Sequence, residues 1–264
     1  MTDPATASSS ASRQLVLTDV SVGFGGLKAL TGVSIAVQPG EVVAVIGPNG
    51  AGKTTLFNAI TGFVPLAAGR ITLGEERIDG LYPHDISARG IRRTFQNGGL
   101  CGHLTVLENV LAGLHSEIRS GILGTVLGLP AARRAEREAV ARARSLLSLL
   151  DIGRLEQQPA STLSGGQQRM VEIIRAIATN PPLLLLDEPA VGLAPPVRIQ
   201  LAEIIRRLAK SQGIGVLLIE HAIELVMGVS DRIIVLNYGE KIADDTPAAI
   251  RSNKAVLEAY LGHG

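Results

Sequence analysis

A glycine-rich stretch between an apolar run and a helical pattern limits the possible folds of this chain more than any other feature of the sequence. Residues 47–55 read GPNGAGKTT and match the pattern G-x-x-x-x-G-K-[ST] in full. The preceding segment Glu41–Ile46 is a compact apolar run, typical of a buried strand. In the following segment Lys53–Ile60, Leu56 and Ile60 are four residues apart, as on one face of a helix. This order of strand, loop and helix predicts a phosphate-binding loop rather than a chance glycine-rich turn.

Each residue type in this loop suits an anionic ligand. Glycines allow backbone N–H groups to point inward without a Cβ in the way, and these groups bind phosphate together with the helix N-terminus. Lys53 places a positive charge on the β- and γ-phosphates, and the Thr54 hydroxyl is a ligand for Mg²⁺. The candidate nucleotide-binding residues of the loop are Gly47, Pro48, Asn49, Gly50, Ala51, Gly52, Lys53, Thr54 and Thr55.

Two adjacent carboxylates follow a second apolar run. Leu183–Leu186 is followed directly by Asp187 and Glu188. A buried parallel strand delivers its last residues to the edge of the sheet where ligands bind in such folds. Asp187 is therefore the candidate ligand for Mg²⁺, and Glu188, which points in a different direction, is the candidate general base for an attacking water. The alternative is a strand that merely ends in an acidic turn, which the phosphate-binding loop in the same chain disfavours.

A second candidate anion site lies at residues 163–168, which read LSGGQQ. Ser164 is a good helix N-cap, and Gly165 and Gly166 leave backbone N–H groups exposed next to Gln167. An ordinary capped helix does not need two glycines in its first turn, where each costs about 1 kcal/mol relative to alanine. The helix that follows carries an apolar stripe of Met170, Ile173, Ile174 and Ile177. The two anion sites either converge within the chain, or each completes a site on another copy.

Strand and helix patterns alternate over most of the chain, which predicts an α/β fold with a parallel sheet. Leu15–Val22 and Ala29–Val37 alternate apolar and polar residues, as half-buried antiparallel strands do. Further strands are expected at Arg70–Leu73, Arg93–Phe95, Pro182–Asp187, Gly215–Glu220 and Arg232–Leu236, and helices at Ala131–Leu150, Val197–Lys210 and Ala222–Met227.

The expected boundaries follow from where these patterns change. Residues 1–13 are rich in Ala, Ser and Thr and indicate a disordered tail. Residues 14–96 and 181–238 form the predicted nucleotide-binding α/β core with an antiparallel β subdomain. Residues 97–180 form a predicted helical subdomain that contains LSGGQQ, and residues 239–264 a short strand and a short amphipathic helix.

The composition excludes several other classes of protein. The 264 residues carry 25 Lys and Arg against 24 Asp and Glu, a net charge of +1, which argues against a basic nucleic-acid binder and a disordered chain. Aromatic residues make up 3%, too few for a base-stacking platform. The single cysteine, Cys101, excludes an internal disulfide, and we expect it to be a small packed residue. No apolar run reaches the roughly 18 residues of a membrane helix, and the N-terminus lacks a secretory pattern, so we expect a soluble cytoplasmic protein.

Together these motifs resemble those of the ATP-binding subunit of an ABC transporter. LSGGQQ is similar to that family's signature motif, and the resemblance extends over residues 14–264. It implies a P-loop NTPase core of the RecA-like type, with ATP and Mg²⁺ as cofactors and hydrolysis of ATP as the activity. It also implies a head-to-tail dimer with a second ATPase subunit, either a copy or a paralogue. In such a dimer the signature of one subunit covers the ATP held by the other.

The resemblance assigns roles to four further positions. Phe24 matches the aromatic residue that stacks on adenine, usually a tyrosine; packing in the strand core is the alternative. Gln96 matches the glutamine that is expected to reach Mg²⁺ and the water and to sense the membrane partner. His221 matches the histidine that contacts the γ-phosphate and Glu188. Ala194 stands where many relatives have an aspartate, so communication between subunits is expected to depend there on backbone or neighbouring groups.

Two segments indicate which class of ABC transporter the chain resembles most. The long segment between Gln96 and Ser164 and the C-terminal AAIRSNKAVLEAYLG both resemble the ATPase subunits of importers for branched-chain amino acids, amides and urea. Among these the chain is similar to the subunit with the longer insertion, although Lys254 replaces a frequent proline. The resemblance implies transmembrane permeases as partners and an indirect connection to a periplasmic solute-binding protein. It further implies a peripheral location on the cytoplasmic face of the inner membrane, and no nucleic acid.

Three alternatives remain at this point. The chain could serve another ABC transporter, such as a lipid or lipopolysaccharide exporter. A soluble ABC ATPase that acts on ribosomes or DNA is disfavoured by the single cassette and the small net charge. The basic segment Arg133–Arg144 is expected to be a solvated helix face with pairs such as Arg134–Glu138, and contact with anionic headgroups or a permease loop is the other interpretation.

Overall fold

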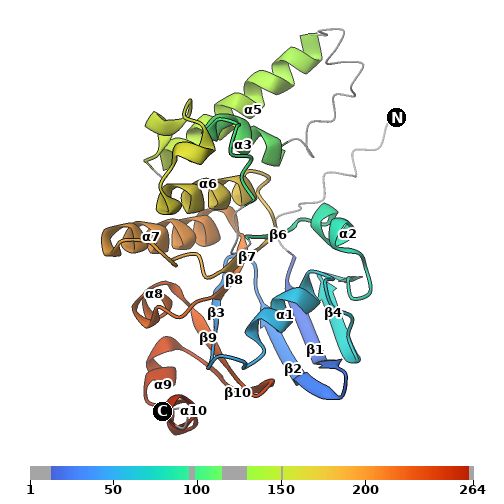
Figure 1. Ribbon diagram of the computed structural model, residues 1–264. Coiled ribbons are helices and arrows are strands. Elements are labelled where there is room, and N and C mark those ends of the chain that lie inside the picture. The colour runs from blue at the N-terminus through green and yellow to red at the C-terminus, as the bar shows by residue number, and fades with distance from the viewer. Residues whose placement is uncertain (1–12, 95–98, 115–129, 150, 262–264) are drawn as a thin grey trace. The chain divides into compact units, whose positions relative to one another are not determined.

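The computed structural model describes residues 13–94, 99–114, 130–149 and 151–261 (Figure 1). These residues form two compact units. The first holds the described residues up to Arg93, together with Pro181–Glu188 and those from Ile205 onward; the second holds Thr94–Asn180 and Pro189–Ile204. The sequence-based boundaries had placed 189–204 in the nucleotide-binding core instead. Among the described helices, none combines the length and apolar character needed to span a bilayer.

The first unit contains an antiparallel sheet with the strand order β2-β1-β4-β5. Its strands are β1 (Leu15–Phe24), β2 (Leu27–Val37), β4 (Ala68–Leu73) and β5 (Glu76–Arg77). Buried and exposed residues alternate along most of β1 and β2, as the sequence predicted, because one face of the sheet packs on the core. The short strand β5 and the helix α2 (Pro83–Ala88) were not predicted.

A second sheet in the same unit has six strands in the order β10-β9-β3-β8-β7-β6. Only the pairing of β10 with β9 is antiparallel; the other pairs are parallel. The bounds are β3 (Val42–Ile46), β6 (Ile91–Arg93), β7 (Leu183–Asp187), β8 (Gly215–Ile219), β9 (Arg232–Asn237) and β10 (Glu240–Asp245). The predicted strand Arg93–Phe95 is misplaced: β6 begins at buried Ile91, which pairs with Leu183, and Phe95 lies outside the described residues.

The register of the parallel strands brings three chain segments to one edge of this sheet. Val45 of β3 lies opposite Ile219 of β8, and Ile219 in turn lies opposite Asp187 of β7. The residues that follow these three strands therefore emerge side by side at the carboxyl edge, where α/β folds bind ligands.

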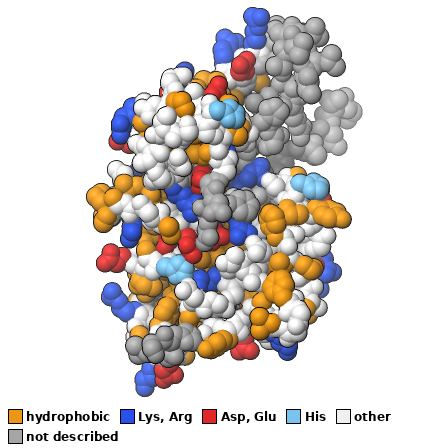
Figure 2. Space-filling view, in the orientation of Figure 1, with side chains coloured by type: hydrophobic (Ala, Val, Ile, Leu, Met, Phe, Trp, Pro, Cys, Tyr) orange, Lys and Arg blue, Asp and Glu red, His pale blue; other side chains and the backbone are white. Residues whose placement is uncertain are grey.

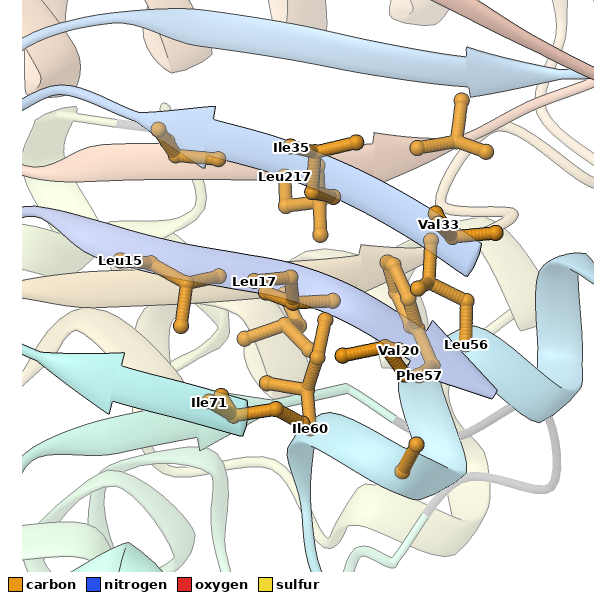
Figure 3. Close-up of a cluster of buried hydrophobic side chains, with 14 of the residues drawn as sticks. Leu15, Leu17, Val20, Val33, Ile35, Leu56, Phe57, Ile60, Ile71 and Leu217 are labelled. Carbon is orange, nitrogen blue, oxygen red and sulfur yellow. The ribbon is translucent and has the colours of Figure 1, made fainter. Parts of the chain in front are cut away.

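Apolar side chains bury both faces of the parallel sheet. Val43 and Val45 of β3 belong to a large cluster with the antiparallel sheet and helix α1 (Lys53–Ile60), whose Leu56, Phe57 and Ile60 are completely buried (Figure 3). The intervening residues of β3, Ala44 and Ile46, belong to a second cluster on the opposite face. This alternation places the strand before the phosphate-binding loop between two packed layers, so its end is rigidly held.

Three short helices complete the first unit: α8 (Ile223–Val229), α9 (Pro247–Arg251) and α10 (Lys254–Leu261). The sequence predicted one helix after the last strand, whereas the structure has two. The Thr246 hydroxyl caps α9 by accepting from the Ala249 N–H, and the Asn253 side chain accepts from the Val256 N–H at the start of α10. Two separate caps therefore divide the C-terminal segment.

The second unit is helical in its described part. It contains α3 (Val106–Leu114), α5 (Pro130–Leu149), α6 (Gly165–Ile177), two 3₁₀ turns (Gly153–Leu155 and Ala160–Thr162) and the first part of α7 (Pro195–Gln212). Helix α3 packs against α5 and α6. The predicted stripe of α6, formed by Met170, Ile173, Ile174 and Ile177, is buried along its length.

Two sequence-based expectations about the surface of the second unit had different outcomes. The Arg134–Glu138 pair on α5 forms at 2.8 Å between two exposed side chains, as predicted. Cys101 is exposed rather than packed, and its backbone N–H donates to the Asn109 side chain. Figure 2 shows basic and acidic side chains interspersed over one face of the described chain, in keeping with the small net charge.

Candidate functional site

The glycine-rich loop connects β3 to α1 in a conformation that only glycine fits at two positions. A Cβ on Gly47 would lie 2.1 Å from the Leu236 carbonyl oxygen, and one on Gly52 would lie 2.7 Å from the Ala29 carbonyl oxygen. Gly52 is also the N-cap of α1, has a φ of 101°, and provides no side chain to cap the helix. The first-turn N–H groups of α1 are thus left without a side-chain cap, which suits an anion.

Lys53 is buried inside this loop. Its Nζ donates to the carbonyl oxygens of Gly47 at 2.7 Å and Pro48 at 2.9 Å. Burial lowers the pKa of the Lys53 ammonium group, and the negative charge of Glu188 acts in the opposite direction. The loop therefore holds a desolvated positive charge whose acceptors are neutral carbonyl groups, an environment in which a phosphate oxygen would be a stronger acceptor.

The buried carboxylate of Asp187 ends strand β7 and forms an ion pair. Arg93 of β6 donates from Nη2 to Asp187 Oδ2 at 2.9 Å, and both side chains are less than a tenth exposed. A second guanidinium nitrogen of Arg93, Nη1, donates to Asn58 Oδ1 at 2.8 Å, and the guanidinium group lies over the Phe57 ring. Sequence reasoning missed Arg93, since a single arginine on a short strand gives no signal of its buried partner.

Breaking this buried pair by removing Arg93 alone should lower the stability of the chain measurably. In Arg93→Met we expect a loss of about 3 kcal/mol in the free energy of unfolding, because Asp187 would keep a buried charge that has lost its cationic partner. Urea titration followed by circular dichroism measures this loss. The matched control is Arg134→Met, whose exposed pair with Glu138 is worth at most about 0.5 kcal/mol. Equal losses in the two variants would contradict the structural importance of the buried pair.

Glu188 and His221 meet at the same edge of the sheet. Glu188 has a φ of 48°, which is uncommon for a residue with a side chain, and its N–H donates to the Ile219 carbonyl at 2.9 Å. This turn directs its carboxylate to His221, with 3.0 Å between Glu188 Oε1 and His221 Nε2. Residues that adopt such strained conformations concentrate at functional sites, where the surrounding structure maintains them.

A cavity of about 490 Å³ joins most of the predicted nucleotide-binding residues in the first unit. It is lined by Phe24, Leu27, Lys28, Ala29, Asn49, Gly50, Ala51, Gly52, Lys53, Thr54, Thr55, Glu188, His221, Tyr238 and Gly239. Gly47 and Pro48 line an adjoining cavity of about 520 Å³ that also contains Tyr260. Phe24 is 48% exposed, so it faces this cavity rather than the strand core.

The predicted second anion site lies in the other unit. Ser164 caps α6: its hydroxyl accepts from the Gln167 N–H at 3.3 Å, and the Gln167 side chain accepts from the Ser164 N–H at 2.9 Å. The first turn of α6 opens on a cavity of about 490 Å³, which Gly165, Gly166 and Ala194 also line. A Cβ on Gly165 would meet nothing within 4 Å, so the glycine leaves an open surface.

Of two other predicted site residues, the structure describes Ala194 but not Gln96. Gln96 lies outside the described residues. Ala194 lies before α7, and its carbonyl accepts the N–H groups of Val197 and Arg198, which begins that helix.

The oxygen ligands available at the loop fit a magnesium ion bound together with a nucleotide. Among the described residues, no group of three or more His, Cys, Asp or Glu side chains is arranged to hold a metal. Magnesium in nucleotide sites needs no such group, since one or two protein oxygens suffice together with phosphates and waters. The Thr54 hydroxyl in the cavity is of this kind, whereas the Asp187 carboxylate is buried at the end of β7 in its ion pair with Arg93.

The fold and these features define the class of P-loop nucleoside triphosphatases: a glycine loop and lysine after one parallel strand, and paired carboxylates after another. The ABC transporter family profile matches residues 30–191, and a profile described as branched-chain amino acid ATP-binding cassette transporter matches residues 240–264. The chain belongs to the ABC transporter family, as one of its ATP-binding, ATP-hydrolysing cassettes.

Individual proteins agree with this assignment. The high-affinity branched-chain amino acid transport ATP-binding protein BraF of Pseudomonas aeruginosa is 44% identical over 248 residues, with 94% of this chain and 97% of that protein covered. The ADP conformation of MJ1267, an ATP-binding cassette of an ABC transporter, has a TM-score of 0.81 at 35% identity, covering 95% and 99% of the two chains. A dimeric post-hydrolysis state of the cassette MJ0796 bound to ADP and Pi has a TM-score of 0.75 at 28% identity, covering 88% and 98%.

Proposed function

We propose that this chain is the ATP-hydrolysing subunit of an importer for branched-chain or related amino acids and amides. The observation that carries this proposal is the 44% identity with BraF, which extends over 94% of the chain. The match of residues 240–264 to a branched-chain amino acid cassette profile supports the same class independently of the nucleotide motifs. Import places the chain on the cytoplasmic face of the membrane beneath two permeases, with a solute-binding protein on the other side.

The loop and the cavity beside it bind ATP in this proposal. The N–H groups of the loop and of the α1 N-terminus hold the β- and γ-phosphates, and Lys53 exchanges its two carbonyl acceptors for phosphate oxygens. The Phe24 ring, half exposed at the end of β1, stacks on the adenine. Thr54, Asp187 and Gln96 hold Mg²⁺, which when bound neutralises charge on the phosphates.

Hydrolysis depends on Glu188 and His221. The Glu188 carboxylate accepts a proton from the water that attacks the γ-phosphorus. The O–H bond of that water breaks and a new P–O bond forms, while the bond from the γ-phosphorus to the bridging oxygen breaks and its electron pair leaves with ADP. His221 holds this carboxylate through the 3.0 Å contact with its Nε2 and orients it toward the cavity that both residues line. Gln96 is proposed to orient the same water and to transmit nucleotide state to the permease.

The N-terminus of α6 serves a second subunit. In the proposed head-to-tail dimer, Ser164, Gly165, Gly166 and Gln167 bind the γ-phosphate of the ATP that the other subunit holds. The open surface at Gly165 and the dimeric state of the related cassette MJ0796 with ADP and Pi support this arrangement. Hydrolysis removes the bridging phosphate and allows the dimer to reopen, which drives the permeases.

Transport measurements in the source cell test the proposal. Deletion of the chain should abolish high-affinity uptake of radiolabelled leucine, and the intact gene should restore it while a Lys53→Ala gene should not. The permeases should copurify with the tagged chain from detergent-solubilised membranes. Unchanged uptake of leucine, isoleucine and valine, together with altered envelope lipids, would favour the exporter alternative instead.

The contact of Phe24 with adenine gives a separate prediction. Phe24→Leu should weaken ATP binding about fivefold to tenfold, because stacking on an aromatic ring contributes about 1–3 kcal/mol per base. Phe24→Tyr keeps the ring and should bind ATP as the natural chain does. Equilibrium titration with a fluorescent ATP analogue measures both dissociation constants.

The control for this prediction is Leu27→Ala. Leu27 lines the same cavity and is 71% exposed, but it has no ring to stack. Its dissociation constant should change less than twofold. If Phe24→Leu and Leu27→Ala weakened ATP equally, Phe24 would contribute apolar surface only, and the stacking role would be wrong.

A further inference from the structure

A buried carboxylate lies at the end of strand β8, next to the proposed catalytic histidine. Glu220 is 2% exposed. A single oxygen of its side chain, Oε2, accepts two backbone hydrogen bonds, from the His221 N–H at 2.8 Å and from the Ala222 N–H at 3.0 Å. The sequence pattern gave no role to this residue, because it appears only as the polar end of an apolar strand.

These two hydrogen bonds define how the chain leaves the strand. The N-cap of α8 is Ala222, which has no side chain that can accept a hydrogen bond. The Glu220 side chain instead accepts the N–H groups of the turn that precedes the helix, those of His221 and Ala222. Hydrogen bonds from N–H groups to a carboxylate are short and strong. These two bonds offset part of the free-energy cost of burying the Glu220 carboxylate. The hydrogen bond from the His221 N–H to Glu220 therefore fixes the backbone of His221.

The direction of the His221 side chain depends on this backbone. The imidazole is 46% exposed, so surrounding side chains enclose only half of it. Its Nε2 nevertheless lies 3.0 Å from Glu188 Oε1, on the neighbouring strand end. Glu188 is fixed in turn by its own hydrogen bond to the Ile219 carbonyl. Glu188 and His221 are thus each oriented by a hydrogen bond from their own backbone N–H.

We propose that Glu220 is a positioning residue that holds His221 in place for hydrolysis. The inference rests on the proposed function, in which His221 orients Glu188. It predicts that loss of the Glu220 acceptor lowers kcat, because the imidazole leaves its place beside Glu188, while the KM for ATP changes little. ATP binding depends on the glycine loop and on Phe24, which the variants below leave unchanged.

Three substitutions of Glu220 separate the effect of its hydrogen-bond acceptor from the effect of its negative charge. Glu220→Gln keeps a carbonyl oxygen at the same reach, and one oxygen is enough for both N–H groups. Glu220→Met has a similar length and no acceptor of comparable strength. Glu220→Asp keeps the charge but withdraws it by one methylene. We expect kcat to fall about 10- to 100-fold in Glu220→Met and about fivefold in Glu220→Asp, whereas Glu220→Gln should keep most of the activity that Glu220→Met loses.

A double-mutant cycle shows whether the effect passes through His221. In a His221→Ala background, Glu220→Met should lower kcat by less than twofold further, since the residue that it positions has been removed. Glu224→Met on the exposed first turn of α8 is the matched control and should leave kcat and KM unchanged. Thermal unfolding and ADP affinity of each variant establish that the fold is retained.

The outcomes distinguish this inference from the proposed function. If His221→Ala hydrolyses ATP normally, the role of His221 is wrong and the inference fails with it. If His221→Ala is impaired but Glu220→Met and Glu220→Asp retain full kcat, the positioning role alone is wrong. A multiplicative loss in the double mutant, or a kcat of Glu220→Gln as low as that of Glu220→Met, would also overturn the positioning role. If Glu220→Met does not fold, the kcat values of Glu220→Asp and Glu220→Gln give the same decision.

Discussion

Glu188→Gln should lower kcat for ATP hydrolysis by about 10²-fold or more while ATP still binds. The amide has the shape of the carboxylate and can still accept a hydrogen bond from His221 Nε2, so the local geometry persists. It cannot accept the proton of the attacking water, so the chemical step stops. The loop that binds the phosphates is unchanged. The variant should therefore accumulate in the state before hydrolysis, which is the ATP-bound dimer.

Two measurements check this prediction. Phosphate release gives kcat, and size-exclusion chromatography with light scattering, in the presence of ATP and Mg²⁺, gives the oligomeric state. Glu224→Gln makes the same chemical change on an exposed turn and should leave kcat unaffected. Normal hydrolysis by Glu188→Gln would remove Glu188 from the role of base. A monomeric variant that binds ATP would instead contradict the shared site.

Elements of the fold could be predicted from the sequence where a single local pattern determines them. Helix α1 has the predicted bounds, Lys53–Ile60, because the loop fixes its start and an apolar stripe fixes its packed face. The strands of the parallel sheet were recognisable as apolar runs, since both faces are buried. Strand β5 pairs with β4 across two residues, but it is itself only two residues long, too short to show a periodic pattern. The second C-terminal helix depends on the side-chain cap of Asn253.

The candidate site shows the same division between local and tertiary information. The loop, Asp187 and Glu188 could be found because their chemistry is concentrated in short motifs. Arg93 and Glu220 could not: their importance lies in buried contacts, one with a strand 94 residues away and one with the backbone of the next turn. The positive φ of Glu188 was equally invisible, since only the surrounding structure can maintain it.

Lys53→Ala should weaken ATP binding by about 100-fold or more. Lys53 is buried in the loop with its Nζ on two backbone carbonyls, and its pKa is lowered by that burial. A charge that has already lost its hydration interacts strongly with a triphosphate that enters the same space, because little water has to be removed from the lysine on binding. Alanine removes this charge and leaves the phosphate oxygens with backbone N–H groups alone. Equilibrium titration with a fluorescent ATP analogue gives the dissociation constant.

The control for Lys53 is a lysine that differs in burial but lines the same cavity. Lys28 is exposed near the start of β2, where it pairs with Gly23 of β1, and it lines the cavity. Its charge is screened by solvent, so Lys28→Ala should weaken ATP by about threefold at most, and the loss should shrink as salt rises. The loss in Lys53→Ala should persist at high salt, because the buried loop excludes the screening ions. Equal and equally salt-sensitive losses would mean that both lysines attract ATP only through the general field of the cavity. In that case the loop would not be the phosphate-binding element, and the shared ATP site built on it would be wrong as well.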